Sequence, residues 1–392
     1  MQIPSWPQAD EREADLLRMV LESPQWGGFH PFVAEFEQSF AAYQHSKYGI
    51  TLCNGTVAME LLLGLMGIGV GDEVIVPAIS FIATATAVSR VGATPVFVDI
   101  EEDSYNIDPA RVREAITPKT KAVMAVHFGG TICNVQALLA ICGEHGITLL
   151  EDAAHAQGSE WKGRRAGSFG LAATFSFQNG KVLTAGEGGI LITSDDDLAV
   201  RARSVANCGR IAGRSFYEHT HLGTNFRLTA FQAAVLLAQF ERLPGQNAQR
   251  AANASLLCEL TADLKQIVWQ PQPAGQTDNP FYLLTGRLTG GKTSRDQFCR
   301  LLASSGVPCT PFYPHTLYRN PLYQNDGGAC RVTPCPMAEA RVLDAFWLPH
   351  RLFLAEPETI RQAAAVIAAA MDGRPASLHR QQLAGSHAGP SL

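Results

Sequence analysis

Cysteine pairs of the kind that build metal sites or disulfide frameworks are missing from this sequence. It contains 9 cysteines, an odd number, and none of them stand in the CxxC spacing. Zinc sites and the scaffolds of small secreted proteins both depend on such pairs. We therefore expect free thiols in a reducing cytoplasm, and no metal centre.

An excess of charge and a long apolar run are also lacking. The net charge is −5 and the isoelectric point is about 6.1, which gives no support to a nucleic-acid or membrane-surface partner. The longest apolar run, at about 57–69, is interrupted by Glu60 and by glycines and is too short to span a bilayer. Residues 1–6 contain no basic segment followed by an apolar run, so we expect no secretory signal and a cytoplasmic protein.

What the sequence does contain is a regular alternation of short apolar runs and stretches with helical spacing. The chain of 392 residues, 46% hydrophobic and 17% charged, is long enough for two domains and a large core. The alternation predicts an α/β fold with a mostly parallel sheet and helices on both faces. The expected strands are 49–53, 73–77, 95–100, 122–127, 148–152, 172–177 and 189–193, and the expected helices are 56–66, 82–91, 109–115, 135–145 and 196–208.

The segments outside this alternation suggest a division of the chain. Amphipathic helices are expected at 10–23 and 32–46, and an apolar helix at 229–242 is followed by a polar segment at 244–253. A second region then has expected strands at 282–287 and 307–313 and helices at 294–304 and 358–371. We predict an N-terminal helical arm (1–30), a large domain (31–243), a small C-terminal α+β domain (244–372) and a polar, disordered tail (373–392).

One lysine lies in a turn between two buried runs. The stretch 176–189 reads SFQNGKVLTAGEGG, and Lys181 is its only lysine. Burial disfavours the charged form of a lysine and makes its amine a nucleophile, and such lysines form Schiff bases with carbonyl compounds such as pyridoxal phosphate (PLP). A lysine in a turn is by base rate more often a surface residue, so the neighbouring motifs have to decide.

Polar residues follow several of the expected strands. Because ligands bind at the carboxyl ends of parallel strands, Asn54-Gly55-Thr56, Ser80-Phe81, His127, Asp152 and the Lys181 turn are candidates for one shared site. The first of these opens a helix, which is suited to a phosphate group but also typical of an ordinary N-cap. Phe81 could stack on a flat heterocycle or simply pack in the core.

Asp152 and His155 are the acidic and imidazole groups at the end of a very apolar strand. A buried acid needs a partner, and a protonated pyridine nitrogen would supply one, as in PLP enzymes. His155 could reach the same ligand. A helix N-cap for Asp152 and a core position for His155 remain open, whereas a metal site would lack a third nearby ligand.

Taken in order, these motifs resemble the DegT/StrS family of PLP-dependent sugar aminotransferases. The pattern is a phosphate seat, a stacking aromatic, Asp-x-x-His, and then Ser-Phe-x-x-x-Lys-x-x-x-x-Gly-Glu-Gly-Gly; the likeness extends from about residue 6 to residue 357. Within the family, the 176–181 and 184–189 motifs are most similar to the keto-cyclitol (scyllo-inosose type) aminotransferases and aminohydroxybenzoate synthase. The stretches 6–8, 208–210 and 347–351 strengthen that similarity.

The resemblance implies a type I aminotransferase-like fold, PLP as cofactor and a role for each matching residue. Lys181 would form the Schiff base, Asp152 would pair with the ring nitrogen, and His155 would lie near the ring hydroxyl. Asn225 would reach the phosphate in the other subunit of a homodimer, which makes the loop 210–224 an interface. The implied cofactor contacts are Gly55, Thr56, Phe81, Asp152, His155, Ser176, Gln178, Lys181 and Asn225.

The implied activity is transfer of an amino group from glutamate or glutamine to a keto-sugar or keto-cyclitol in amino-sugar or secondary-metabolite biosynthesis. One alternative is a dehydratase of the aminohydroxybenzoate synthase type that uses the same Lys181; family dehydratases with histidine at this position are disfavoured. Another is a non-catalytic sensor on the same fold. In the second region, Tyr313, His315, His350 and Arg351 are either substrate contacts or surface residues.

Overall fold

The computed structural model describes residues 1–291, 293–325 and 329–374. Its largest element is an eight-stranded sheet in which only β9 runs against its neighbours. The predicted fold class, an α/β protein with a mostly parallel central sheet, is therefore confirmed. In spatial order the strands are β1 (Tyr48–Leu52), β9 (Gly189–Thr193), β8 (Ala172–Ser176), β5 (Thr148–Asp152), β4 (Thr120–Val126), β2 (Glu73–Pro77), β3 (Thr94–Val98) and β14 (Arg331–Val332).

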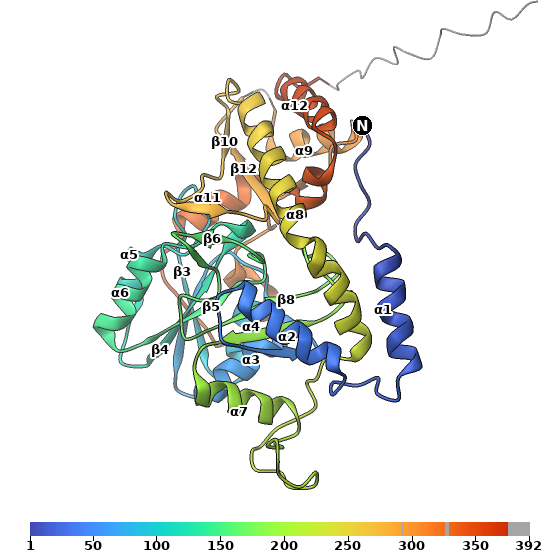
Figure 1. The fold of residues 1–392 in the computed structure, drawn as a ribbon. Coiled ribbons are helices and arrows are strands. Elements are labelled where there is room, and N and C mark those ends of the chain that lie inside the picture. Colours follow the sequence, from blue (N-terminus) through green and yellow to red (C-terminus); the bar gives the residue numbers. More distant parts are fainter. Residues whose placement is uncertain (292, 326–328, 375–392) are drawn as a thin grey trace, which may run out of the picture.

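Helices cover both faces of this sheet, so its strands are buried on both sides (Figure 1). Along β2, Val74 and Val76 belong to one apolar core and Ile75 to the other, as side chains alternate along a strand. One core is shared with α3 (Gly55–Leu65), α4 (Ala83–Arg90) and α7 (Asp196–Ala206). The other is shared with α1 (Glu11–Glu22), α2 (Pro31–Tyr43), α5 (Pro109–Ala115), α6 (Val135–His145) and α8 (Ala230–Leu260).

A second, four-stranded antiparallel sheet, called the small sheet below, has its own core. In spatial order it contains β10 (Ile267–Trp269), β12 (Leu283–Leu288), β15 (Ala345–Pro349) and β13 (Thr310–Pro311). The helices α9 (Arg295–Ser304) and α12 (Pro357–Met371) pack on it at the upper end of the molecule (Figure 1). A three-stranded sheet contains β11 (Gln276–Asp278), β6 (Glu160–Trp161) and β7 (Arg164–Arg165). The remaining elements are α10 (Pro321–Gln324), α11 (Pro336–Asp344) and 3-10 turns at Phe128–Gly130, Leu317–Arg319 and His350–Leu354.

Most predicted elements are present near their expected bounds, but two predictions were wrong. The helix expected to end at 242 continues through Pro244 as the single helix α8, where a polar connecting segment was expected. Leu243 lies in the core of the large sheet and Leu257 in that of the small sheet, so burial at both ends outweighs the backbone hydrogen bond that proline removes. The strand expected at 307–313 is shortened to β13.

The division into domains stays a prediction. The change from one core to the next falls within α8, between Leu243 and Ala254, close to the proposed boundary at 243. The proposed tail at 373–392 falls almost wholly outside the described residues. Within those residues, no helix combines the length and the apolar character that crossing a membrane requires.

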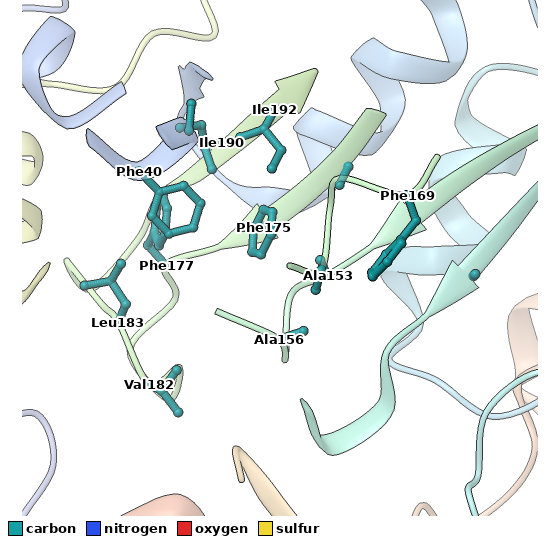
Figure 2. Close-up of a cluster of buried hydrophobic side chains, with 14 of the residues drawn as sticks. Phe40, Ala153, Ala156, Phe169, Phe175, Phe177, Val182, Leu183, Ile190 and Ile192 are labelled. Atoms are coloured by element: carbon teal, nitrogen blue, oxygen red, sulfur yellow. The ribbon is translucent and has the colours of Figure 1, made fainter. Parts of the chain in front are cut away.

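The loop between β8 and β9 carries Lys181 and is anchored in the core on both sides of this residue. Phe177, Val182 and Leu183 are buried, and Figure 2 shows them at the edge of the cluster that includes Phe40. The Phe177 amide donates to the Gly188 carbonyl at 2.8 Å, which closes the loop at its base. The loop is therefore fixed by burial, and Lys181 is free to face away from the core.

Candidate active site

A cavity of about 860 Å³ lies at the carboxyl ends of β5 and β8, and the small sheet contributes the other wall. Most of the residues that were expected to share one site at the strand ends line this cavity. The cavity is lined by Gly55, Thr56, Phe81, Asp152, His155, Ser176, Gln178 and Lys181, whereas Asn225 and His127 are outside it.

One end of the cavity is formed by the start of α3. Asn54 is the N-cap and accepts a hydrogen bond from the Val57 amide at 2.9 Å. The preceding amides, those of Gly55 and Thr56, have no partner within the helix and carry the positive end of its dipole. A Cβ at Gly55 would lie 3.0 Å from the Ser176 Cβ, so glycine allows the strand end to approach the helix. This arrangement suits a phosphate group.

Asp152 ends β5 with its carboxylate at the cavity wall. The residue is only 6% exposed, and Oδ2 accepts a hydrogen bond from the Thr84 hydroxyl at 2.7 Å. Thr84 in turn contacts the Ser80 hydroxyl at 2.7 Å, and the Ala154 amide donates to Oδ1 at 3.2 Å. No lysine, arginine or histidine of the described residues forms an ion pair with this carboxylate, which leaves it available to a cationic ligand.

His155 is held as a neutral ring. Its Nδ1 accepts a hydrogen bond from the Gly129 amide at 3.3 Å, so the proton is on Nε2. Burial, with a smaller contribution from Lys181, lowers the pKa of His155 well below its ordinary value of 6.5. The ring also packs on Tyr282, with 4.3 Å between ring centroids. His155 can therefore donate one hydrogen bond into the cavity.

Tyr282 connects the two halves of the site. The Nζ of Lys181 lies 4.4 Å from the centroid of the Tyr282 ring, and the same ring packs against His155. From the sequence, Tyr282 was expected only as the first residue of a strand, and no pattern indicated this contact. The other cavity residues without a role assigned from the sequence are Trp6, Glu187, Tyr313, Trp347, His350 and Arg351. His315 is not among the residues that line the cavity; its Nδ1 lies 3.1 Å from the Thr316 carbonyl oxygen.

The inclusion of His127 in the shared site was wrong. Its Nε2 lies 2.9 Å from Glu151 Oε2, and both side chains are fully buried. Glu151 also accepts the amides of Gly167, Phe169 and Gly170 at 2.6–2.8 Å. Because side chains alternate along β5, Glu151 points away from the face on which Asp152 lies, and His127 belongs to this structural network.

Asn225 lies apart from the cavity of its own subunit. It forms an isolated bridge with Asn207, its Oδ1 accepts the Arg227 amide at 3.3 Å, and the residue is exposed. The preceding loop 210–224 carries apolar side chains into solvent, and Leu222 is 99% exposed. The role of Asn225 toward a partner subunit stays a prediction.

The buried histidines make the free energy of unfolding depend on pH. Burial, followed by the cation of Arg250, lowers the pKa of His350 well below 6.5, as burial does for His155. Below pH 6.5 the unfolded chain takes up a proton at His350 that the folded protein does not, so the contribution of the neutral ring to stability is fully present above that pH and falls progressively below it. We expect His350→Phe to reduce the slope of unfolding free energy against pH by about 1.4 kcal/mol per unit below the ordinary pKa. Urea unfolding over this range measures it, and equal slopes for both proteins would contradict it.

The family model for DegT/DnrJ/EryC1/StrS aminotransferases matches residues 7–368. The chain belongs to this family. This DegT-family protein is a PLP-dependent aminotransferase, in agreement with the cavity described above. The proposed roles of the individual residues remain predictions.

Similarity to other proteins extends over nearly the full chain. The chain is 37% identical to 3-amino-5-hydroxybenzoate synthase of Amycolatopsis mediterranei (strain S699), over 94% of the chain and 97% of the relative. It is 35% identical to a putative L-glutamine:3-amino-2,3-dideoxy-scyllo-inosose aminotransferase of Micromonospora echinospora, with 91% of each protein covered. The crystal structure of 3-amino-5-hydroxybenzoic acid synthase is similar with a TM-score of 0.88 at 36% identity, covering 94% of this chain and 98% of the other.

The residues of the cavity fit PLP. The start of α3 with Ser176 offers amide and hydroxyl donors for the phosphate, and Asp152 offers a buried carboxylate without an ion-pair partner in the described chain for the pyridine nitrogen. Lys181 supplies the amine, and Phe81, 58% exposed at the cavity wall, offers a face for the ring. These donors and acceptors are complementary to a phosphorylated pyridine aldehyde.

Proposed function

We propose that this DegT-family enzyme transfers an amino group from glutamine or glutamate to a keto-cyclitol or keto-sugar in amino-sugar or secondary-metabolite biosynthesis. The observation that carries the proposal is the convergence of Lys181, Asp152 and the start of α3 on one cavity. The similarity of the chain to a putative L-glutamine:3-amino-2,3-dideoxy-scyllo-inosose aminotransferase supports a cyclitol acceptor. We place the enzyme in the cytoplasm, because its 9 cysteines are all free.

The chemistry divides between cofactor and protein. When bound, PLP supplies an electron sink for the carbanion formed at the substrate carbon. Lys181 moves a proton to and from that carbon. Asp152 would hold the ring nitrogen of the cofactor in its protonated form, and the neutral His155, whose Nδ1 accepts from the Gly129 amide, would have its Nε2–H available as a donor to the cofactor. Tyr282 and the small sheet cover Lys181 and limit its access to water.

Arg351 is the residue we propose for the α-carboxylate of the amino donor. The basic residues that line the described cavity are His155, Lys181, His350 and Arg351. Burial lowers the pKa of both histidines and keeps them neutral, and Lys181 takes part in the reaction itself. Arg351 is the remaining cation, and a guanidinium binds a carboxylate through two parallel hydrogen bonds.

Arg351→Gln is expected to raise the KM for the amino donor by about 10- to 100-fold, because a charge-assisted hydrogen bond is lost. Stopped-flow absorbance of the donor half-reaction measures this effect. Arg361→Gln, on the exposed side of α12, is the matched control and is expected to leave it unchanged. An unchanged donor KM in Arg351→Gln would remove this residue from the donor site.

A screen of donors and acceptors tests the function itself. We expect glutamine or glutamate to convert the bound cofactor to its amine form, as read from its absorbance spectrum. Addition of a keto-cyclitol should then restore the original spectrum and yield an amino-cyclitol. Nucleotide keto-sugars are tested beside it, and conversion of those substrates alone would assign a sugar acceptor instead. Absence of conversion with every donor would reject the aminotransferase activity.

The second candidate is a dehydratase of the 3-amino-5-hydroxybenzoate synthase type, which is favoured by 37% identity to that enzyme. It would use Lys181 in the same cavity to remove a proton before water is lost. The two functions differ in their products. Incubation with an aminoshikimate-type substrate, followed by ultraviolet detection of an aromatic product, would support the dehydratase, whereas amine transfer to a cyclitol supports the main proposal.

We also propose a homodimer in which Asn225 reaches the cofactor phosphate of the partner subunit. The exposed loop 210–224 and the position of Asn225 outside its own cavity support this arrangement. Mixing subunits with Lys181→Ala and subunits with Asn225→Ala is expected to restore about one quarter of wild-type activity, because half of the dimers are mixed and have one complete site. Activity no higher than the sum of the separate variants would contradict a shared site.

A further inference from the structure

The N-terminal segment before α1 contacts both cores and the lysine loop, which is the loop between β8 and β9 that carries Lys181. Met1 and Ile3 pack against the core of the small sheet. The Gln8 carbonyl accepts a hydrogen bond from Gln239 on α8, which packs on the large sheet. Trp6 lies between these two anchors and lines the cavity. The segment therefore holds Trp6 in place beside Lys181.

Two consecutive carbonyl groups of the lysine loop are bound by side chains from distant parts of the chain. The indole Nε1 of Trp6 donates to the Lys181 carbonyl at 3.1 Å. The Nε2 of His350 lies 3.1 Å from the Gly180 carbonyl, and because a carbonyl only accepts, this nitrogen carries the proton. The two rings pack edge to face, with 4.7 Å between centroids.

These carbonyls belong to the two peptide planes that meet at the Cα of Lys181. The orientation of both planes sets the direction in which the Lys181 side chain leaves the backbone. Within the loop, the backbone of Lys181 makes a short-range hydrogen bond, from its amide to the Gln178 carbonyl at 2.8 Å. The additional hydrogen bonds from Trp6 and His350 therefore restrict the position of the amine.

The surroundings of His350 maintain the tautomer that this hydrogen bond requires. The side chain is buried, and its Nδ1 has no hydrogen-bond partner within the described chain. Its charged neighbours are the cations Arg250, Arg351 and Lys181, all of which disfavour a second proton on the ring. Arg250 is fully buried, and its guanidinium lies 5.3 Å from the Trp6 ring centroid. His350 thus stays neutral, with Nε2 as donor.

We propose that Trp6 and His350 are positioning residues that hold the backbone of Lys181 so that its amine is aligned for proton transfer. The inference rests on Lys181 being the reactive amine of the proposed function. It also gives a role to the stretches around Trp6 and at 347–351, which the sequence singled out without a local explanation. Both residues act through the loop, so their loss is expected to affect turnover more than substrate binding.

The test compares Trp6→Phe and His350→Phe, which keep an aromatic ring and remove the N–H donor. Amide hydrogen exchange of the cofactor-free protein is measured for a peptide covering 178–185. We expect exchange there to be about fivefold faster in each variant, the effect of one hydrogen bond, and unchanged in a peptide covering β9. His350→Gln retains a nitrogen donor and should exchange more slowly than His350→Phe. Trp26→Phe, a half-exposed tryptophan beside Phe231, is the matched control.

Kinetics provide the second readout. With the preferred donor, we expect kcat to fall about tenfold in Trp6→Phe and in His350→Phe, while the donor KM changes less than threefold. Wild-type exchange in 178–185 together with wild-type kcat would overturn the inference. So would a loss confined to KM, which would instead make these residues substrate contacts. If the wild-type protein transfers no amine, the proposed function fails, while the exchange experiment still decides whether the two residues hold the loop.

Discussion

Replacing Lys181 by alanine is expected to lower kcat by at least about 10³-fold with every donor and acceptor, because the variant lacks the amine that we propose moves the proton. The loop itself should survive, because Val182 and Leu183, beside the replaced residue, are buried members of the large-sheet core, at the edge of the cluster drawn in Figure 2. Stopped-flow measurement of the donor half-reaction gives the rate. The melting temperature should stay near that of the wild type.

A chemical experiment distinguishes loss of the amine from loss of the fold. After treatment with borohydride, a peptide containing residue 181 should carry the mass of the reduced cofactor in the wild type and not in Lys181→Ala. Lys162→Ala is the control, because Lys162 is also a turn lysine but is exposed and packs over the Trp161 ring. Normal turnover in Lys181→Ala, or labelling at another lysine, would remove Lys181 from the mechanism.

Asp152→Asn is expected to lower kcat by about 10²- to 10³-fold, the usual cost of losing a directed charge at a reaction centre. The amide has the size of the carboxylate: its oxygen can accept the hydrogen bond from the Ala154 amide, and its NH2 group can donate to the Thr84 hydroxyl, which can in turn donate to Ser80. It has no charge with which to keep a proton on the ring nitrogen. The variant should therefore fold and bind PLP, with weaker affinity and a changed absorbance spectrum.

The control for this variant is Thr84→Val, which removes the hydroxyl that donates to Asp152 and leaves the charge. We expect it to lower kcat only about fivefold, as for the loss of one hydrogen bond. Equilibrium dialysis gives the affinity for PLP and the half-reaction gives kcat. Wild-type kcat in Asp152→Asn would show that the carboxylate only caps the end of β5 and does not act on the cofactor.

The sequence could predict which polar groups lie near one another, because parallel strands bring their carboxyl ends to one edge of the sheet. This predicted that Asp152, the Lys181 turn and the start of α3 lie near one another, and residues of all three line the cavity. The same rule failed for His127, because it identifies an edge but not the face toward which a side chain points. The burial of the Glu151 network decides that face.

The rule that proline and polar residues end a helix gave a wrong prediction in α8. Pro244 and the polar residues after it predicted the end of a helix, and the structure has a continuous helix from Ala230 to Leu260. The cost of one missing hydrogen bond is local, whereas the gain comes from two apolar cores that lie far apart in the sequence. No window of sequence around Pro244 contains that information.

The sequence by itself determined the alternation of strands and helices, and therefore the sheet and the edge at which Lys181 and Asp152 meet. These follow from periodicity and from the geometry of parallel strands, which are local properties. Only the tertiary structure decided that Trp6, Tyr282 and His350 surround the lysine. Their positions depend on how the small sheet and the N-terminal segment pack on the large sheet, and such packing is a property of the whole chain.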